Sequence, residues 1–330
     1  MTQILQEKAP EGGSFRDKLR RLKSSKYYGY LLLAGMVLFF YAFFKILTPD
    51  NFGSPANLYS YLQSSIIYSV GGCGLYFIVV MGLFDFAVGA NVVLSSIVGV
   101  ILSKYLGYFG FVAGCLGCGT LIGLLIGFLY NRLNVPSMIV TVGLMLIFES
   151  VAVFVAGGVK QTLGEDLRFF SSAPGNIILA ALAFALMYFI LNYTKIGTYC
   201  NAIGSNEFTA RNMGIDVKKY KLIGFMLLHF FVGIMAILTV SYGTTMTALT
   251  GMSTMSRNFT PLMGTFFGVA FRKYGKPITA IVVGEFIIAL IFNGFVALGA
   301  PTTIQNVVTG AALLVIVALT ARGGKGSVVK

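Results

Sequence analysis

The chain has 330 residues, of which 57% are hydrophobic and only 11% charged, and its formal net charge is +13. Soluble globular domains have about 25% charged residues, so this composition excludes an ordinary soluble domain. The cations lie scattered at the ends of apolar runs, which does not favour a nucleic-acid-binding surface.

Apolar runs follow one another along most of the chain. A membrane-spanning helix needs about 20 mainly apolar residues. The pattern is one of continuous runs and not of the alternation typical of membrane strands, so we expect helices, which satisfy their own backbone in lipid. The sequence predicts an all-α polytopic membrane protein with about ten transmembrane helices, at residues 28–47, 60–81, 87–104, 108–130, 137–157, 175–193, 221–243, 259–271, 278–298 and 303–320.

The distribution of Lys and Arg predicts the orientation, because cytoplasmic loops are enriched in both. If the N-terminus is cytoplasmic, 19 of the 24 cations fall on the cytoplasmic side. We therefore expect both termini inside, with a basic segment at 1–27, a single transmembrane domain at 28–320 and a tail at 321–330. The basic segment fits either an interfacial amphipathic helix or a disordered anchor, and it shows no signal-peptide pattern. The other side keeps Lys45, Lys104, Lys160, Arg168 and Arg257.

The chain divides into two halves of similar length. Spans at 60–157 and at 221–320 each begin with a long helix, followed by a zone interrupted by small and polar residues, "GLFDFAVGANVVLSS" and "YGTTMTALTGMSTMS". Matched interruptions indicate two inverted-topology halves with a pathway between them. The candidate residues for this pathway, or for the helix break itself, are Asp85, Gly89, Asn91 and Thr245.

Cysteine and histidine give no sign of a cofactor site. Cys115 and Cys118 form a C-x-x-C pattern, but it lies inside an apolar run without a second pair of ligands. We expect small-residue helix packing there. His229 is the single histidine and is expected to be hydrogen-bonded in the interior. No Walker loop occurs, so any ATP must be bound by another chain.

Three carboxylates fall within apolar runs, where charge is costly and often functional. Asp85 lies at an interruption and is expected to cap a helix that starts at Phe86. Glu149 and Glu285 lie deeper. Either is a candidate for proton or sodium coupling, and the favoured interpretation is a protonated or hydrogen-bonded carboxyl group inside the bundle.

A short charged helix is predicted in the longest inner connection, within "NAIGSNEFTARNMGIDV". Ser205 or Asn206 supplies an N-cap oxygen, and Glu207 lies in the first turn, where the helix dipole favours negative charge. Arg211 stands four residues after Glu207, in the stabilising order. Gly214 is the expected C′ residue.

Three blocks, in the same order, resemble the ribose-type permeases of bacterial ABC importers. "GLFDFAVGANVVLSSIVGV" is similar to their "DLSVG" segment. "YNRLNVPSMIVTVGLMLIFESVAVFVAGG" is similar to their "L-x-V-P-x-F-I-V-T-L-G" stretch. The charged loop is the most specific block and resembles "G-N-x-x-A-A-R-x-x-G-I-x-V", through Asn206, Glu207, Ala210, Arg211, Gly214 and Ile215. The resemblance covers about residues 60–320.

The resemblance implies an ABC importer permease of the bacterial inner membrane that takes up a small polar solute, most simply a monosaccharide. Loop 194–220 would carry the coupling helix that docks into a separate ATPase subunit, which binds ATP and Mg²⁺, so this chain needs no cofactor of its own. A second permease subunit, an extracytoplasmic solute-binding protein and membrane lipid complete the expected partners, without nucleic acid. The implied ATPase-coupling residues are Ser205, Asn206, Glu207, Ala210, Arg211 and Gly214.

Alternatives remain open for both cargo and mechanism. Nucleosides, branched-chain amino acids and signalling furanoses are alternative cargoes. A proton- or sodium-coupled secondary transporter is the main alternative function, and a structural or sensory scaffold is another. One departure from the family bears on the cargo more than on the fold. Where the family has a glycine-rich "GGTSLAGGxG", this chain reads "MGTFFGVAFRKYGKP", with Phe266, Phe267, Phe271, Arg272 and Lys273 in place of small residues.

Overall fold

A computed structural model describes residues 28–275 and 277–301, with a few further residues between 304 and 314. The N-terminal segment 1–27, the tail 321–330 and most of the run 303–320 lie outside the described residues, so the expectations for them are not tested. The described secondary structure is helical apart from one isolated β-bridge, which confirms the all-α class.

The helices follow the apolar runs closely. The described residues form the α-helices α2 (Tyr28–Leu47), α3 (Pro55–Val80), α4 (Val88–Leu133), α5 (Ser137–Ala156), α6 (Gly175–Tyr193), α7 (Lys195–Ser205), α8 (Glu207–Asn212), α9 (Val217–Ser241), α10 (Phe259–Phe271) and α11 (Pro277–Ala297). Short 3-10 turns are η1 (Glu165–Leu167), η2 (Phe169–Ser171), η3 (Met255–Asn258) and η4 (Arg272–Tyr274).

Within the described part of the chain, seven helices are long and apolar enough to cross a membrane. Two of the expected spans, 87–104 and 108–130, are the two arms of α4. The arms meet at Gly107, whose backbone is non-helical with φ of 57°. The arms pack closely, since a Cβ on Gly114 would lie 2.9 Å from the Cα of Gly99. The Cys115 thiol is buried against Gly99, as expected for small-residue packing.

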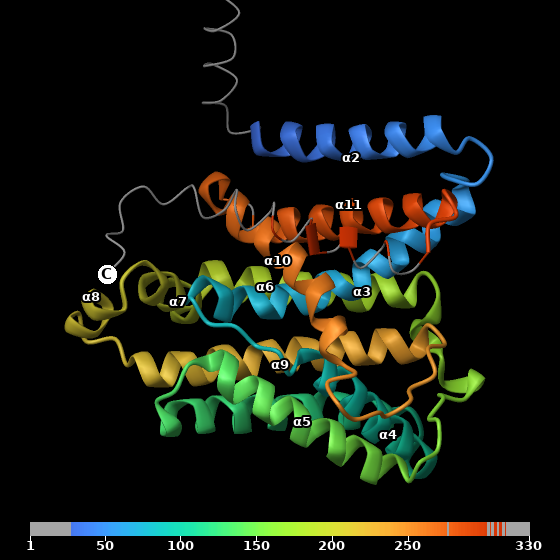
Figure 1. The fold of residues 1–330 in the computed structure, drawn as a ribbon. Helices are drawn as coiled ribbons and strands as arrows, with labels where there is room; N and C mark the ends of the chain where they lie inside the picture. Colours follow the sequence, from blue (N-terminus) through green and yellow to red (C-terminus); the bar gives the residue numbers. More distant parts are fainter. Residues whose placement is uncertain are drawn as a thin grey trace, which may run out of the picture.

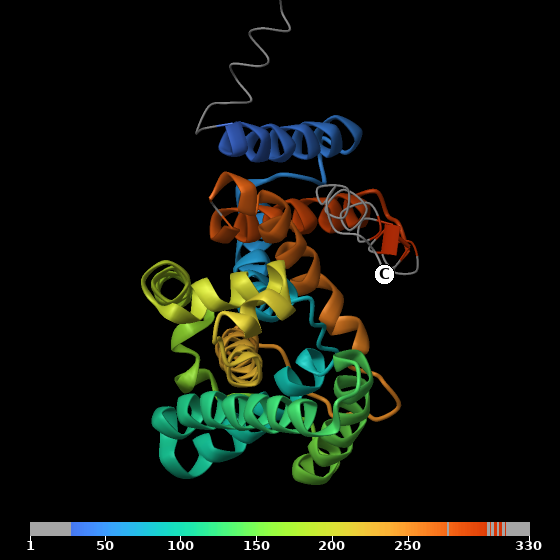
Figure 2. The same cartoon turned by 90° about the vertical axis from the view of Figure 1, so that its left-hand side faces the viewer.

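The centre of the bundle consists of α3 and α9, the first helices of the two expected halves. They are the most buried of the long helices and they pack against each other in opposite directions. Gly71 of α3 faces Met235 of α9, whereas near the other ends of these helices Met81 faces Gly224. Figures 1 and 2 show α2 along one edge of the bundle and α4 with α5 along the opposite edge.

The connections gather at the two ends of the bundle (Figure 1). One end holds the start of α2, the α4–α5 connection, α7, α8 and η4, and the other holds the connections α2–α3, α5–α6 and α9–α10. The first group contains the connections in which Lys and Arg are concentrated.

The phenylalanines that replace the expected glycine-rich segment are buried in α10. Phe267 and Phe271 pack in a cluster with residues of α2 and α11. A Cβ on Gly284 would lie 2.6 Å from the Phe267 ring, so Gly284 on α11 leaves the space that Phe267 fills. Gly284 therefore accommodates the ring of Phe267 where α10 and α11 pack together.

Candidate functional site

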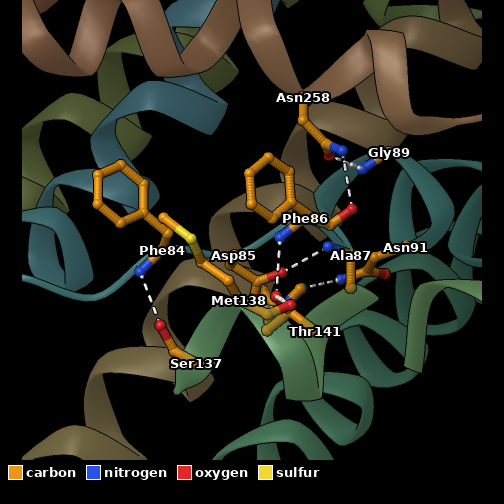
Figure 3. Close-up of polar contacts among 11 residues, drawn as sticks. Phe84, Asp85, Phe86, Ala87, Gly89, Asn91, Ser137, Met138, Thr141 and Asn258 are labelled. Atoms are coloured by element: carbon orange, nitrogen blue, oxygen red, sulfur yellow. Dashed lines mark hydrogen bonds and ion pairs between the residues drawn. The ribbon is translucent and has the colours of Figure 1, made fainter. Parts of the chain in front are cut away.

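The first interruption is the connection between α3 and α4, residues 81–87, which turns back into the bundle (Figure 1). Its backbone is not helical, so its N–H groups need partners from elsewhere. The Ser137 hydroxyl accepts from the N–H of Phe84 at 3.0 Å, and the Thr141 hydroxyl accepts from the N–H of Phe86 at 3.1 Å (Figure 3). The start of α5 thus supports the interruption.

Asp85 has a different role from the one expected. The helix starts at Val88, not at Phe86, and its N-cap residue Ala87 makes no side-chain cap bond. Asp85 Oδ1 instead accepts from the N–H of Ala87 at 2.6 Å and closes the turn before the helix (Figure 3). The expectation that Asp85 caps the helix was wrong because two further residues remain outside the helical geometry.

Asp85 also belongs to a buried chain of hydrogen bonds that crosses from α4 to α9. His229 Nε2 lies 2.9 Å from Asp85 Oδ2, and His229 Nδ1 lies 2.6 Å from Asn91 Nδ2. Ser95 donates its hydroxyl hydrogen to Asn91 Oδ1. All four side chains are buried. Because the Asn91 amide donates to Nδ1, the imidazole carries its proton on Nε2 and donates to Asp85. The hydrogen-bonded interior position expected of His229 is confirmed.

The side chain of Asn258 in η3 connects the two interruptions through hydrogen bonds. Its Oδ1 accepts from the N–H of Gly89 at 2.6 Å, and its Nδ2 donates to the carbonyl of Phe86 at 2.7 Å (Figure 3). A Cβ on Gly89 would overlap the carbonyl oxygen of Thr254. The segment after α9 therefore lies directly on the first turn of α4.

Glu149 holds the same segment from the side of α5. Its carboxylate accepts from the N–H of Met252 at 2.9 Å, and from the N–H and hydroxyl of Thr254 at 2.8 and 2.7 Å. The Ser253 hydroxyl adds a longer contact of 3.4 Å. Glu149 is 1% exposed, so the expected interior hydrogen bonding is confirmed. Glu285 accepts from the N–H of Gly264 at 3.1 Å through one oxygen only.

Thr245 lies apart from the residues with which the sequence grouped it. It is exposed in the α9–α10 connection, where its hydroxyl accepts from Thr162 at 3.1 Å. The next residue, Met246, forms the isolated bridge with Gln161. Of the predicted pathway or break residues, the structure brings Asp85, Gly89 and Asn91 together and places Thr245 with the outer connections.

The charged helix predicted in the longest inner connection is α8. Asn206, not Ser205, is its N-cap and accepts from the N–H of Thr209 at 3.0 Å. Ser205 is the last residue of α7 and donates to the Asn201 carbonyl. Gly214 follows with φ of +83°, as expected for a C′ residue.

Glu207 ties α8 to the membrane helices. Its carboxylate forms one ion pair with Arg211 at 3.2 Å and another with Lys221 of α9 at 2.9 Å. Lys221 is 8% exposed, and its Nζ lies 3.4 Å from the hydroxyl of Tyr130 near the end of α4. Ala210 is buried on the inner face of the same helix.

Sequence reasoning missed two exposed apolar residues beside this helix. Phe208 is 73% and Met213 is 75% exposed. Apolar side chains in an otherwise polar connection were the available signal, since a large exposed apolar group at a fixed position often marks an interface.

A pocket of about 190 Å³ lies near the other end of α3 and α9, and the sequence did not predict it. Apolar side chains from three helices line part of it, namely Ile67, Val92 and Met235. Polar side chains line the rest, namely Ser64, Tyr68, Thr239, Tyr242, Thr244 and Arg257. Neither Asn91 nor Thr245 contributes to it.

Apolar helices, two interruptions in contact and a capped helix outside the spans define a polytopic membrane protein of the transporter type. Residues 57–317 match the family described as branched-chain amino acid transport system, permease component, and the chain belongs to this family. It is therefore a multi-pass membrane permease component.

Curated relatives cover most of the chain. The chain is 28% identical over 306 residues to the D-allose transport system permease protein AlsC of Escherichia coli (strain K12), covering 89% of this chain and 91% of that protein. It is 26% identical over 303 residues to the ribose import permease protein RbsC of the same strain, covering 87% and 91%. The xylose/arabinose import permease protein XylH of Sulfolobus acidocaldarius is 30% identical over 218 residues, covering 62% and 58%. No solved structure matches.

Proposed function

We propose that the chain is the membrane-spanning subunit of an ATP-driven ABC importer that carries a monosaccharide into the cell by alternating access. The observation that carries the ATP-driven part is the ion pair between Glu207 and Lys221, which joins a capped helix outside the spans to the most central helix pair. The monosaccharide part is supported by relatives named for allose, ribose, xylose and arabinose.

The ATPase subunit docks on α8 in this proposal. Asn206 and Gly214 give the helix defined ends, Arg211 offers charge, and Phe208 with Met213 offers apolar area. Movement imposed on α8 reaches α9 and α4 through Glu207, Lys221 and Tyr130. ATP and Mg²⁺ bind to the partner, and a second permease subunit and a solute-binding protein complete the importer.

Two further features support an inverted repeat and a cytoplasmic location for the end of the bundle that bears α8. The helices α3 and α9 hold equivalent places in the two halves and run in opposite directions. If the chain has ten spans and both termini lie inside, most Lys and Arg residues fall in segments on the cytoplasmic side. In this orientation the outer end bears the α5–α6 and α9–α10 connections, where a solute-binding protein docks, and the chain lies in the bacterial inner membrane.

A secondary transporter is the second candidate, and it rests on Glu285. This carboxylate is 1% exposed, and its Oε2 has no hydrogen-bond partner among the described residues. Glu149 is a weaker coupling candidate because its two oxygens already accept hydrogen bonds from the α9–α10 connection.

Uptake by the purified chain separates the two functions. Vesicles that contain the chain alone are loaded with a pH gradient or a sodium gradient and offered radiolabelled D-ribose and D-allose. We expect no uptake without the ATPase, and ATP-dependent uptake when the complete importer is reconstituted. Gradient-driven uptake by the chain alone, lost in Glu285→Gln, would establish the secondary transporter instead.

A further inference from the structure

The pocket between α3, α4 and α9 lies in the half of the bundle opposite α8. Its lining residues include Ser64 and Ile67 from the first half of α3, and Met235 and Thr239 from the last part of α9. Its volume of about 190 Å³ equals the space of about six liquid water molecules. This is the scale of one small ring that bears several hydroxyl groups.

The wall of the pocket is divided into an apolar part and a polar part. Ile67, Val92 and Met235 are buried and form the apolar part. The polar part holds only hydroxyl groups and one guanidinium. Tyr68 and Tyr242 each offer a ring face together with a hydroxyl, a combination that suits a ligand with both C–H faces and polar edges.

Arg257 is the one charged residue among the described residues that line the pocket. Its side chain makes no hydrogen bond or ion pair with any residue that the structure describes, so its donors are available to a ligand. Arg257 is exposed, and the position of its backbone is set by its neighbours. The next residue, Asn258, is clamped to Phe86 and Gly89, and a Cβ on Gly89 would lie 3.1 Å from the Arg257 Cβ.

The chemistry of the lining selects among the possible cargoes. A branched-chain amino acid carries an ammonium group, which needs a carboxylate or several acceptors when it leaves water. The described residues that line the pocket include no carboxylate, and the guanidinium of Arg257 repels an ammonium group. A neutral monosaccharide presents oxygens that accept from Arg257 and Ser64. It also presents hydroxyl hydrogens, which can be donated to Thr239, whose own hydroxyl donates to the carbonyl of Met235.

We propose that this pocket is a monosaccharide-binding site within the membrane domain and that Arg257 is its main hydrogen-bond donor. The inference rests on the proposed import function and deepens it, because it adds a site on the permease itself. The interruption network has a positioning role here, since Asn258 and Gly89 hold the backbone from which Arg257 projects.

The chain contains no tryptophan, so one introduced indole reports on the pocket without background. The full chain carrying Tyr242→Trp in lipid nanodiscs is titrated with D-ribose, D-allose, L-arabinose and L-leucine. We expect at least one aldose to change the emission with saturation, and L-leucine to leave it unchanged. Tyr105→Trp, at a residue that is 81% exposed and does not line the pocket, is the matched control and stays silent.

Substitution of the arginine tests its role. In the Tyr242→Trp background, Arg257→Gln is expected to raise the half-saturating aldose concentration about tenfold or more, because a hydrogen bond from a charged donor is lost. Arg257→Lys recovers part of this. Lys160→Gln removes an exposed cation from the same end of the bundle and is expected to change nothing. Calorimetric titration of the unsubstituted chain covers the case in which the indole itself blocks the pocket.

The proposal is overturned if no aldose binds by either method, if L-leucine binds in place of the aldoses, or if Arg257→Gln binds as tightly as the parent. Failure of the proposed function is seen separately, in whole cells that carry the complete importer. If aldose uptake does not require this chain, the proposed import function is wrong. If uptake requires the chain but Arg257→Gln leaves it unchanged, only the proposed sugar site in the pocket is wrong.

Discussion

Glu207 of α8 and Lys221 of α9 form an ion pair of 2.9 Å in which the lysine is nearly buried and the carboxylate is half exposed. Tyr130 lies next to the same ammonium, with its ring centroid 5.5 Å from the Nζ atom. One carboxylate at the base of the bundle therefore connects α8 with two of the spans.

Reversing this carboxylate tests the connection. Glu207→Lys is expected to abolish ATP-driven uptake, because it places a second cation beside the buried ammonium of Lys221. The double variant Glu207→Lys with Lys221→Glu restores opposite charges and is expected to recover part of the activity. Uptake and ATP hydrolysis are measured together in the reconstituted importer. Equal uptake by the single variant and the parent would contradict the coupling role.

A substitution of Arg211 distinguishes an effect on ATPase docking from an effect on folding. Arg211 is exposed, and among the described residues it forms an ion pair with Glu207 alone, so Arg211→Glu costs about 1 kcal/mol of stability or less. We expect normal insertion and an unchanged melting temperature, together with loss of uptake, since the proposed ATPase-docking surface includes this exposed charge. Co-purification of the ATPase gives the measurement. Retention of the ATPase and full uptake would place the docking surface elsewhere.

Substitutions of Gly89 and Gly143 provide a test variant and a matched control for the contact between the interruptions. Gly89→Ala places a methyl group on the Thr254 carbonyl and is expected to destabilise the fold by about 1–3 kcal/mol. Gly143→Ala on α5 meets no atom within 4 Å and is expected to be neutral or slightly stabilising. Thermal unfolding in detergent compares the two. Similar melting temperatures would show that the segment after α9 does not rest on α4.

The Glu149 carboxylate accepts two backbone N–H groups, and an amide at this place presents one oxygen only. Glu149→Gln therefore leaves a donor unpaired in a buried site and is expected to cost about 1–3 kcal/mol. Ser150→Ala, at the exposed neighbour, is the control and is expected to stay near the parent. Protease accessibility of the α9–α10 connection is measured alongside melting. No change in either would remove Glu149 as its anchor.

Cys200 of α7 gives a chemical probe outside the spans. Burial raises the pKa of its thiol to about 12. At pH 8 only about one thiol in ten thousand is then a thiolate, so we expect very slow alkylation by maleimide that speeds up as the pH rises. Phe208→Cys, at an exposed site, is expected to react quickly and to be protected by the bound ATPase. Rapid labelling of Cys200 at pH 8 would mean that α7 opens.

Apolar run lengths predicted the helices well, because lipid-spanning length is a local property of the chain. The expected range 259–271 is the range of α10, and 175–193 is that of α6. The contacts of the interruption were not predictable in this way. His229 and Asp85 lie 144 residues apart, and only the packing of α9 on α4 brings them together.

The charged residues show the same limit. The pairing of Glu207 with Arg211 follows from helical spacing and was predicted, whereas Lys221 counted only as a loop cation until the structure placed it against Glu207. Arg257 was likewise assigned to an outer loop, because it lies between two predicted spans. Its place beside a pocket depends on residues from three helices, and no pattern within one segment encodes that.

Asn258 has one consequence for how the protein works. Its planar amide forms hydrogen bonds with two backbone groups at once. A displacement of one interruption therefore either moves the other with it or breaks both hydrogen bonds. Within a single subunit, the two interruptions are thereby mechanically coupled to each other.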